Sequence, residues 1–269
     1  MTDRLPLPAP EILARADGAT IAYRRRRAAG AGAGLPGVVF LGGFASDMGG
    51  IKATALDGFC RDRGQAFLRF DYFGHGGSSG AFGAGTITRW TEDALVVLDA
   101  LTEGPQILVG SSMGGWIMLN VAVARPARLA ALVGIAPAPD FTEDIWTGLG
   151  PDGQATLLSD GQIFLPSGYS AAPYPIARAM IEDGRRHLRL AGPIAIDCPV
   201  RLIHGMGDAD VPWRKTLRLA ELVTAGDVHA TLIRDGDHRL SRDQDLDLLL
   251  NTLARLSDRL RAPRDSRDS

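Results

Sequence analysis

The sequence predicts an α/β fold in which helices cover both faces of a mostly parallel central sheet. Short apolar runs typical of buried strands alternate with longer segments of helical periodicity. This alternation favours parallel strands joined by crossover helices. Strands are expected at 20–24, 38–41, 66–70, 106–109, 129–135, 200–204 and 229–233. Helices are expected at 52–63, 90–101, 114–124, 213–223 and 244–260.

The alternation breaks between about residues 137 and 193. This segment is richer in Pro, Gly and aromatic residues than its surroundings, and one helix is expected within it, near 174–190. We interpret 137–193 as a lid inserted over the carboxyl ends of the strands. Residues 1–136 and 194–269 then form the α/β core. A peripheral excursion that never touches the site is the alternative interpretation.

Length and composition place the chain among ordinary globular proteins. Its 269 residues suffice for one large α/β domain with an insertion, or for two small domains. Apolar residues make up 45% and charged residues 22%. The 29 basic and 31 acidic residues give a net charge of −2, so the sequence does not favour a nucleic-acid partner. It gives no prediction of the oligomeric state.

The sequence predicts a cytoplasmic protein without a membrane span. Residues 1–10 lack the basic stretch and apolar core of a signal peptide. The least polar stretch, 107–124, contains Ser111, Ser112 and Asn120, which is typical of a buried strand followed by a buried helix.

We expect no metal and no organic cofactor. The only cysteines, Cys60 and Cys198, form no C-x-x-C motif and no Cys/His cluster with ligand spacing, and we expect two buried free thiols. The glycine-rich run at 30–34 precedes a strand and opens no helix. We therefore interpret it as a hairpin connection and not as a dinucleotide-binding loop.

The most informative motif is Gly110-Ser-Ser112-Met-Gly114. It reads G-x-S-x-G, and it lies between an expected strand and an expected helix. This context predicts a nucleophile elbow, with Ser112 at the tip of a sharp turn. Glycine at positions 110 and 114 lets the turn close against the adjoining strand and helix.

A serine hydroxyl needs a base, and the base needs an orienting acid. Of the five histidines, only His238 lies in the loop that leaves the last expected strand. The acid should leave the preceding strand, where Asp208 and Asp210 are the candidates. We favour Asp208, which lies in the turn just after the strand, and expect Asp210 to shape the chain toward Val211.

The oxyanion formed during acyl transfer needs preorganised N–H donors. One should be the backbone N–H of Met113, which follows the nucleophile at the start of a helix. The other should come from the loop after strand 38–41, where Gly42 and Gly43 let the backbone approach a substrate, and the N–H of Phe44 is the best candidate.

With Ser112, Asp208 and His238 in this order, the chain resembles the α/β-hydrolase superfamily over nearly its whole length. The loop Asp71-x-x-Gly74-x-Gly76-x-Ser78 is also similar to a loop common in that superfamily, and we expect it to shape the floor of the site.

Three longer segments carry a narrower resemblance. Residues 43–57, 104–120 and 198–214, together with Asp237-His238-Arg239, are similar to the mitochondrial abhydrolase-domain enzymes that act as acyl-glucuronide esterases and palmitoyl-protein thioesterases. The resemblance implies the same triad and an acyl pocket under the lid. The chain departs from it in lacking a recognisable transit peptide, and the lid is the least similar part.

These observations predict a serine hydrolase that cleaves carboxylic esters or acyl thioesters through an acyl-enzyme. Ser112 at the elbow argues against epoxide hydrolases and haloalkane dehalogenases, which need Asp there. A peptidase and a haloperoxidase-like side activity stay open. The alternative from another class is a catalytically silent binding module whose lid closes over a ligand.

Overall fold

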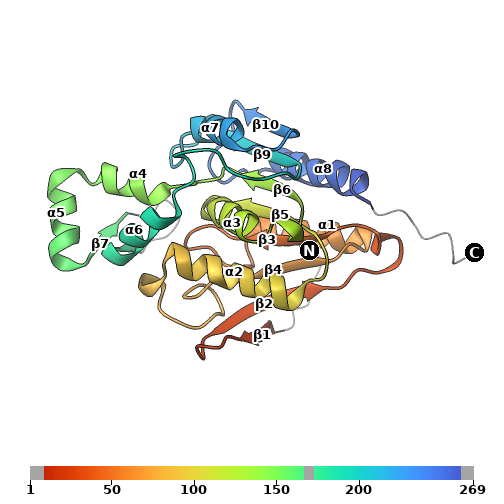
Figure 1. The fold of residues 1–269 in the computed structure, drawn as a ribbon, viewed down its shortest axis with the longest axis horizontal. Helices are drawn as coiled ribbons and strands as arrows, with labels where there is room; N and C mark the ends of the chain where they lie inside the picture. Colours follow the sequence, from red (N-terminus) through yellow and green to blue (C-terminus); the bar gives the residue numbers. More distant parts are fainter. Residues whose placement is uncertain (1–8, 167–172, 262–269) are drawn as a thin grey trace, which may run out of the picture.

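The computed structural model describes residues 9–166 and 173–261, so most of the N-terminal stretch 1–10 lies outside it. Its core is an eight-stranded sheet of order β1-β2-β4-β3-β5-β6-β9-β10 (Figure 1). β1 and β2 run antiparallel to their neighbours, and the remaining pairs are parallel. The predicted mostly parallel sheet is therefore confirmed. The strands are β1 (Glu11–Ala14), β2 (Thr20–Arg26), β3 (Gly37–Leu41), β4 (Phe67–Phe70), β5 (Gln106–Ser111), β6 (Leu129–Ile135), β9 (Val200–Gly205) and β10 (Val228–Ile233).

Helices cover both faces of this sheet, as predicted. Alternate side chains of β3 divide between two cores: Val39 and Leu41 face one, and Val38 and Phe40 face the other. The first core is closed by α2 (Ile87–Leu101), α3 (Met113–Ala124) and α7 (Arg214–Leu222). The second is closed by α1 (Ile51–Arg63) and α8 (Asp243–Arg259).

Two expectations near the N-terminus are corrected. Strand β1 was not predicted, because its side chains are mostly exposed and show no apolar alternation. The glycine-rich run is not a hairpin connection, because β2 pairs with β4 and not with β3. Residues Gly30–Gly32 form a short 3-10 helix instead, and a Cβ on Gly32 would lie 2.1 Å from the Gly64 carbonyl oxygen.

The segment between β6 and β9 stands to one side of the sheet, at the left of Figure 1. It holds α4 (Phe141–Gly148), α5 (Gly150–Asp160), the antiparallel pair β7 (Gln162–Leu165) and β8 (Tyr174–Ala177), and α6 (Arg178–Gly184). The predicted helix at 174–190 is wrong at both ends. Pro175 favours an extended Tyr174, so the chain first forms β8. The division of the chain at 137 and 193 stays a prediction.

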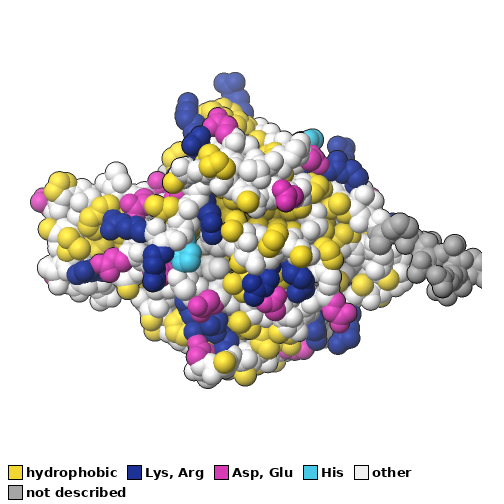
Figure 2. Space-filling model, viewed as in Figure 1, with side chains coloured by type: hydrophobic (Ala, Val, Ile, Leu, Met, Phe, Trp, Pro, Cys, Tyr) yellow, Lys and Arg dark blue, Asp and Glu magenta, His cyan; other side chains and the backbone are white. Residues whose placement is uncertain are grey.

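The described surface mixes both signs of charge. Figure 2 shows basic and acidic side chains interspersed over the visible face. Within residues 9–166 and 173–261, no helix is both long enough and apolar enough to span a bilayer. Both cysteines are free thiols, but only Cys60 is fully buried, so the expectation of two buried thiols is half wrong.

The topology creates a crevice between β3 and β5. From β3 the chain continues to β4 on one side, and β5 then pairs with the other side of β3. α1 follows β3 on one face of the sheet, whereas α3 follows β5 on the opposite face. The loops that leave two such strands diverge, and ligands of α/β sheets bind at this position. Phe44 and Ser112 lie in these two loops.

Candidate active site

Ser112 lies in a strained turn between β5 and α3. Its backbone angles are φ 54° and ψ −119°, in a region that residues with a side chain rarely adopt. The turn is fixed by three backbone hydrogen bonds: the Ser112 N–H donates to the Ile135 carbonyl, and the Ser112 carbonyl accepts from the N–H groups of Gly115 and Ala138. The strain presents the hydroxyl beyond the end of the sheet, as the G-x-S-x-G motif predicts.

The flanking glycines are required by close backbone contacts. A Cβ on Gly114 would lie 2.1 Å from the Leu41 carbonyl oxygen, and a Cβ on Gly110 would lie 2.4 Å from the Gly114 carbonyl oxygen. Neither carbonyl can move without shifting a strand or a helix. The elbow is therefore packed directly against the end of β3, which leads into the Phe44 loop.

The structure brings Ser112, His238 and Asp208 into one hydrogen-bonded chain. The Ser112 Oγ lies 3.0 Å from the His238 Nε2, and the His238 Nδ1 lies 2.7 Å from the Asp208 Oδ2. The ionised carboxylate can only accept, so the proton belongs on Nδ1. Nε2 then carries a lone pair that accepts the hydrogen bond of the serine hydroxyl.

Asp208 is held as a carboxylate by four hydrogen bonds. Its Oδ1 accepts from the backbone N–H groups of Asp210 and Val211, and its Oδ2 faces His204 and His238. Its side chain is 0% exposed. Burial raises the pKa of such a group, but the hydrogen bonds from His204, His238 and Val211 outweigh it and hold the Asp208 pKa well below its usual value.

His204 contacts Asp208, which the sequence did not reveal. It is fully buried, and its Nε2 lies 3.0 Å from both the Asp208 Oδ2 and the Val211 carbonyl oxygen. Two acceptors require a proton on Nε2, so Nδ1 accepts from the Thr216 hydroxyl 2.6 Å away. Only the fold shows that this strand-end histidine touches the carboxylate four residues later.

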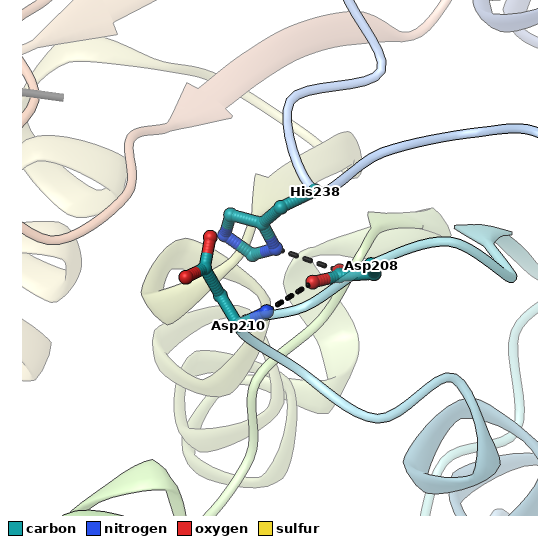
Figure 3. Close-up of side chains that lie close together, drawn as sticks. All are labelled: Asp208, Asp210 and His238. Atoms are coloured by element: carbon teal, nitrogen blue, oxygen red, sulfur yellow. Dashed lines mark hydrogen bonds and ion pairs between the residues drawn. The ribbon is translucent and has the colours of Figure 1, made fainter. Parts of the chain in front are cut away.

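Asp210, the other carboxylate considered from the sequence, is exposed. In Figure 3 its side chain lies beside the His238 ring, while Asp208 meets the ring at Nδ1. Asp208, Asp210 and His238 each offer a polar atom within 4.8 Å of the others. Both nitrogens of His238 are already engaged by Ser112 and Asp208, so we interpret the cluster as part of the hydrogen-bonded chain and not as a cation site.

The two predicted oxyanion donors flank the nucleophile. In the described parts of the chain, neither the Phe44 N–H nor the Met113 N–H donates to a protein acceptor. A Cβ on Gly43 would lie 3.5 Å from the Ser112 Cβ, which shows how closely the Phe44 loop approaches the serine. The Phe44 ring is anchored among Phe82, Trp90, Phe141 and Tyr174, with ring centroids 4.8–5.9 Å apart.

The loop at 71–79 supports the Phe44 loop from below. Asp71 accepts from the Met48 N–H at 2.6 Å and from the Gly77 N–H at 2.8 Å. The His75 Nε2 accepts from the Ala45 N–H at 3.3 Å, and burial lowers the His75 pKa, which keeps this nitrogen an acceptor. The supporting loop is thus bonded to Ala45 and Met48, in the stretch between Phe44 and α1.

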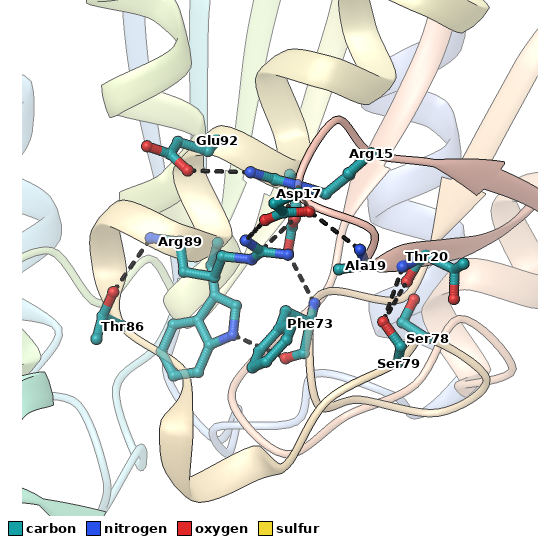
Figure 4. A network of polar contacts seen from close by, with 12 residues as sticks. Arg15, Asp17, Ala19, Thr20, Phe73, Ser78, Ser79, Thr86, Arg89 and Glu92 are labelled. Carbon is teal, nitrogen blue, oxygen red and sulfur yellow. Dashed lines mark hydrogen bonds and ion pairs between the residues drawn. The ribbon is translucent and has the colours of Figure 1, made fainter.

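A polar network in turn fixes this supporting loop to the core (Figure 4). The Phe73 N–H donates to Asp93 at 2.7 Å, and the Trp90 indole donates to the Phe73 carbonyl at 3.0 Å. On the other side, Ser79 accepts from the Thr20 N–H at 2.8 Å. The loop that we expected to shape the floor of the site therefore supports the site indirectly, through its hydrogen bonds to the backbone of residues 45–48.

Comparison with known proteins agrees with this geometry. The profile of the family described as serine aminopeptidase, S33, matches residues 36–159. The mouse protein named palmitoyl-protein thioesterase ABHD10, mitochondrial, is 41% identical over 250 residues, which cover 93% of this chain and 82% of that protein. The chain belongs to the α/β-hydrolase superfamily.

Two solved structures show the same fold for this hydrolase. Mouse alpha/beta hydrolase domain-containing protein 10 has a TM-score of 0.86 and 40% identity, covering 94% of this chain and 100% of that one. A putative hydrolase from Agrobacterium vitis S4 has a TM-score of 0.87 and 43% identity with the same coverage. The predicted α/β-hydrolase fold and the resemblance to this enzyme group are confirmed, and so is the prediction of an enzyme.

The predicted cytoplasmic location is wrong by the same comparison. The mouse relative, which matches this hydrolase over nearly all of the chain, is named as a mitochondrial protein. The expectation had rested on the missing features of a leader at residues 1–10, and those residues do not determine the subcellular location.

A cavity of about 190 Å³ lies beside Ser112. Apolar and aromatic groups line part of it, including Phe40, Phe44 and Tyr174. The loop between β3 and α1, the loop that carries His238 and the first turn of α1, with Lys52, line the rest. Neither the helical periodicity of 52–63 nor any motif pointed to this lysine.

Proposed function

We propose that this hydrolase cleaves carboxylic esters or acyl thioesters through an acyl-enzyme intermediate on Ser112. The observation that carries the proposal is the continuous hydrogen-bonded chain from Ser112 through His238 to Asp208. A hydroxyl becomes nucleophilic when a positioned base takes its proton, and the base is effective when a carboxylate fixes its tautomer.

In the first half of the reaction, the Ser112 Oγ forms a bond to the carbonyl carbon while its proton passes to the His238 Nε2. The carbonyl electrons move onto oxygen, and the N–H groups of Phe44 and Met113 stabilise the oxyanion. Each such donor contributes on the order of 3 kcal/mol to the transition state. The bond to the leaving oxygen or sulfur then breaks, and His238 returns the proton to that atom.

In the second half, water takes the place of the leaving group. It gives one proton to the His238 Nε2 as its oxygen attacks the acyl carbon, and the same two N–H groups hold the second oxyanion. The bond to the Ser112 Oγ breaks, and His238 returns the proton to the serine. Asp208 stays ionised throughout and stabilises the imidazolium.

Two substrate classes follow from the relatives and from the resemblance. The mouse relative is named a palmitoyl-protein thioesterase, so acyl thioesters of proteins are the first class. Acyl glucuronides are the second. A peptidase is less favoured because the described lining of the cavity offers only one carboxylate, Asp47, to a substrate amine.

The test is turnover of p-nitrophenyl esters of increasing chain length beside acyl thioesters of the same lengths. We expect the wild-type protein to release both acyl groups, with an initial burst where the acyl-enzyme accumulates. Ser112→Ala should abolish turnover with an unchanged circular dichroism spectrum. A folded wild-type protein that turns over no ester or thioester would instead favour the catalytically silent binding module.

A further inference from the structure

We propose that the cavity beside Ser112 contains a cationic subsite, centred on Lys52, for a carboxylate or phosphate on the leaving group of the substrate. The inference rests on the proposed function, because a leaving group exists only if Ser112 is acylated. It deepens that function by naming the residue that recognises a negative charge on the departing group, such as the carboxylate of a glucuronate.

Lys52 differs from most cations of this chain. Only two of the 29 basic residues are lysines, Lys52 and Lys215. Lys215 contacts the Asp144 carboxylate, on α4. Lys52 donates instead to the Arg239 backbone carbonyl, and among the described residues no carboxylate oxygen lies within 4.0 Å of its Nζ. Lys52 lines the cavity, and its one bond to a carbonyl leaves two of the three N–H donors of its ammonium for a ligand.

The position of Lys52 places it on the leaving-group side. His238 must return a proton to the departing oxygen or sulfur, so the leaving group lies at the imidazole. Lys52 contacts Arg239, the residue after His238, and both basic residues line the cavity. Phe44 and Tyr174 line the cavity beside the proposed oxyanion donor instead, and there we place the acyl chain.

The electrostatics of the cavity favour an anion. A partly desolvated ammonium with no carboxylate in direct contact is unfavourable, and a bound anion would offset that cost. Burial, followed by the neighbouring Arg239, lowers the Lys52 pKa to about 8, although Asp237 and Asp245 oppose this shift. Asp245 is itself paired with Arg242 at 2.9 Å, and the Asp237 Oδ1 accepts the Leu240 N–H at 2.9 Å, so neither of these carboxylates forms an ion pair with Lys52.

Asp47, which also lines the cavity, is not the countercharge of Lys52. Its side chain is exposed, and its Oδ1 accepts the Gly49 N–H at 2.7 Å within its own turn. A lysine ammonium is a compact charge that binds carboxylate and phosphate alike. Either anion would make the leaving group negative, so matched substrates must distinguish a carboxylate from a phosphate.

The experiment compares butyrate esters of three phenols that differ in one substituent: 4-hydroxybenzoate, 4-hydroxybenzamide and 4-hydroxyphenyl phosphate. The first two have nearly the same shape, but only the first carries a charge. We expect the wild-type kcat/KM for the carboxylate ester to exceed that for the amide ester by about tenfold. A still larger value for the phosphate ester would assign the subsite to phosphate.

The variants are Lys52→Met, Lys52→Arg and, as a matched control, Lys215→Met. Lys52→Met should reduce the carboxylate-to-amide ratio to about one, Lys52→Arg should keep most of it, and Lys215→Met should leave it unchanged. Loss of the contact to Arg239 alone would slow both esters equally and leave the ratio intact. An intact ratio in Lys52→Met, or a wild-type ratio of about one, would overturn the proposal.

A second readout separates this inference from the proposed function. Acetylation by N-hydroxysuccinimidyl acetate, mapped by mass spectrometry, reports the accessibility of the two lysines. We expect 4-hydroxybenzoate to protect Lys52 and not Lys215, and 4-hydroxybenzamide to protect neither. If no ester is cleaved but this protection is seen, the hydrolytic mechanism fails while the anion subsite stands. Equal labelling with and without 4-hydroxybenzoate would overturn the subsite.

Discussion

His204 and His238 share one acceptor, the Oδ2 atom of Asp208, at 3.0 and 2.7 Å. His204 lies near the end of β9 and His238 lies in the loop after the neighbouring strand β10, and only His238 reaches Ser112. The catalytic carboxylate that we propose is thus held from two sides. Its orientation depends on a buried imidazole and, through the Thr216 hydroxyl, on the first turns of α7.

This arrangement predicts that His204→Asn lowers kcat by about tenfold, because Asp208 loses a charge-assisted hydrogen bond. The Asp208 pKa should rise, so the acid limb of the pH profile should move to higher pH. Thr216→Val should act in the same direction without touching Asp208, and Thr216→Ser should restore the wild-type profile. A lower melting temperature with an unchanged pH profile would mean that His204 only fills space.

Asp208→Asn should lower ester turnover on the order of 10³- to 10⁴-fold, because the amide favours the wrong tautomer of His238. The Asn oxygen can still accept the N–H groups of Asp210 and Val211, so folding should be intact. Asp210→Asn should change turnover by less than about threefold, since Asp210 is exposed and does not meet Nδ1. Steady-state kinetics that reversed this ranking would move the acid to Asp210.

Gly114→Ala should both destabilise the protein and slow it. The added Cβ would meet the Leu41 and Gly42 carbonyl oxygens at 2.1 and 2.5 Å and push the Phe44 loop away from the elbow. We expect a loss of about 2 kcal/mol in urea unfolding. Gly58→Ala, in α1 with no atom within 4 Å of the new Cβ, should gain up to about 1 kcal/mol. Equal stability of the two variants would show that the elbow tolerates a side chain.

The anion preference should depend on pH through Lys52. Its pKa is lowered to about 8, first by burial and then by Arg239, so the ammonium is charged below pH 8 and neutral above it. The carboxylate-to-amide ratio of kcat/KM should therefore be largest below pH 8 and should fall as the pH rises through 8. Lys52→Arg stays charged and should keep its ratio to pH 9.5. A wild-type ratio that is flat from pH 6.5 to 9.5 would contradict the role of Lys52.

Much of the core could be predicted because its central strands, such as β3 and β6, are continuous apolar runs bounded by turn residues. Ser112 stood out for the same reason, since its motif lies between such a run and a helix. The region after Pro137 could not be predicted in this way. Gly148 and Gly150 divide two short helices there, and Tyr174 begins a strand of a small hairpin. These short elements pack on one another and on α2, so their apolar patterns are short.

The parts of the site that the sequence did not reveal depend on tertiary proximity. Lys52 is an ordinary helical residue until the fold places it against Arg239, which is distant in sequence. His204 ends a strand, as expected, but its contacts with Asp208 and Thr216 follow from the turn after β9. The tautomer of a histidine and the ion pairing of a lysine depend on neighbours that are distant in sequence, so a sequence pattern does not reveal them.

The most direct test is the mass of the intact protein after reaction with a fluorophosphonate. A serine made nucleophilic by His238 should take up one probe per chain, and peptide mapping should place it on Ser112. Ser112→Ala should take up none, and His238→Gln should react at least about a hundredfold more slowly. A well-folded wild-type protein that takes up no probe, or Ser112→Ala that still takes it up, would contradict the account.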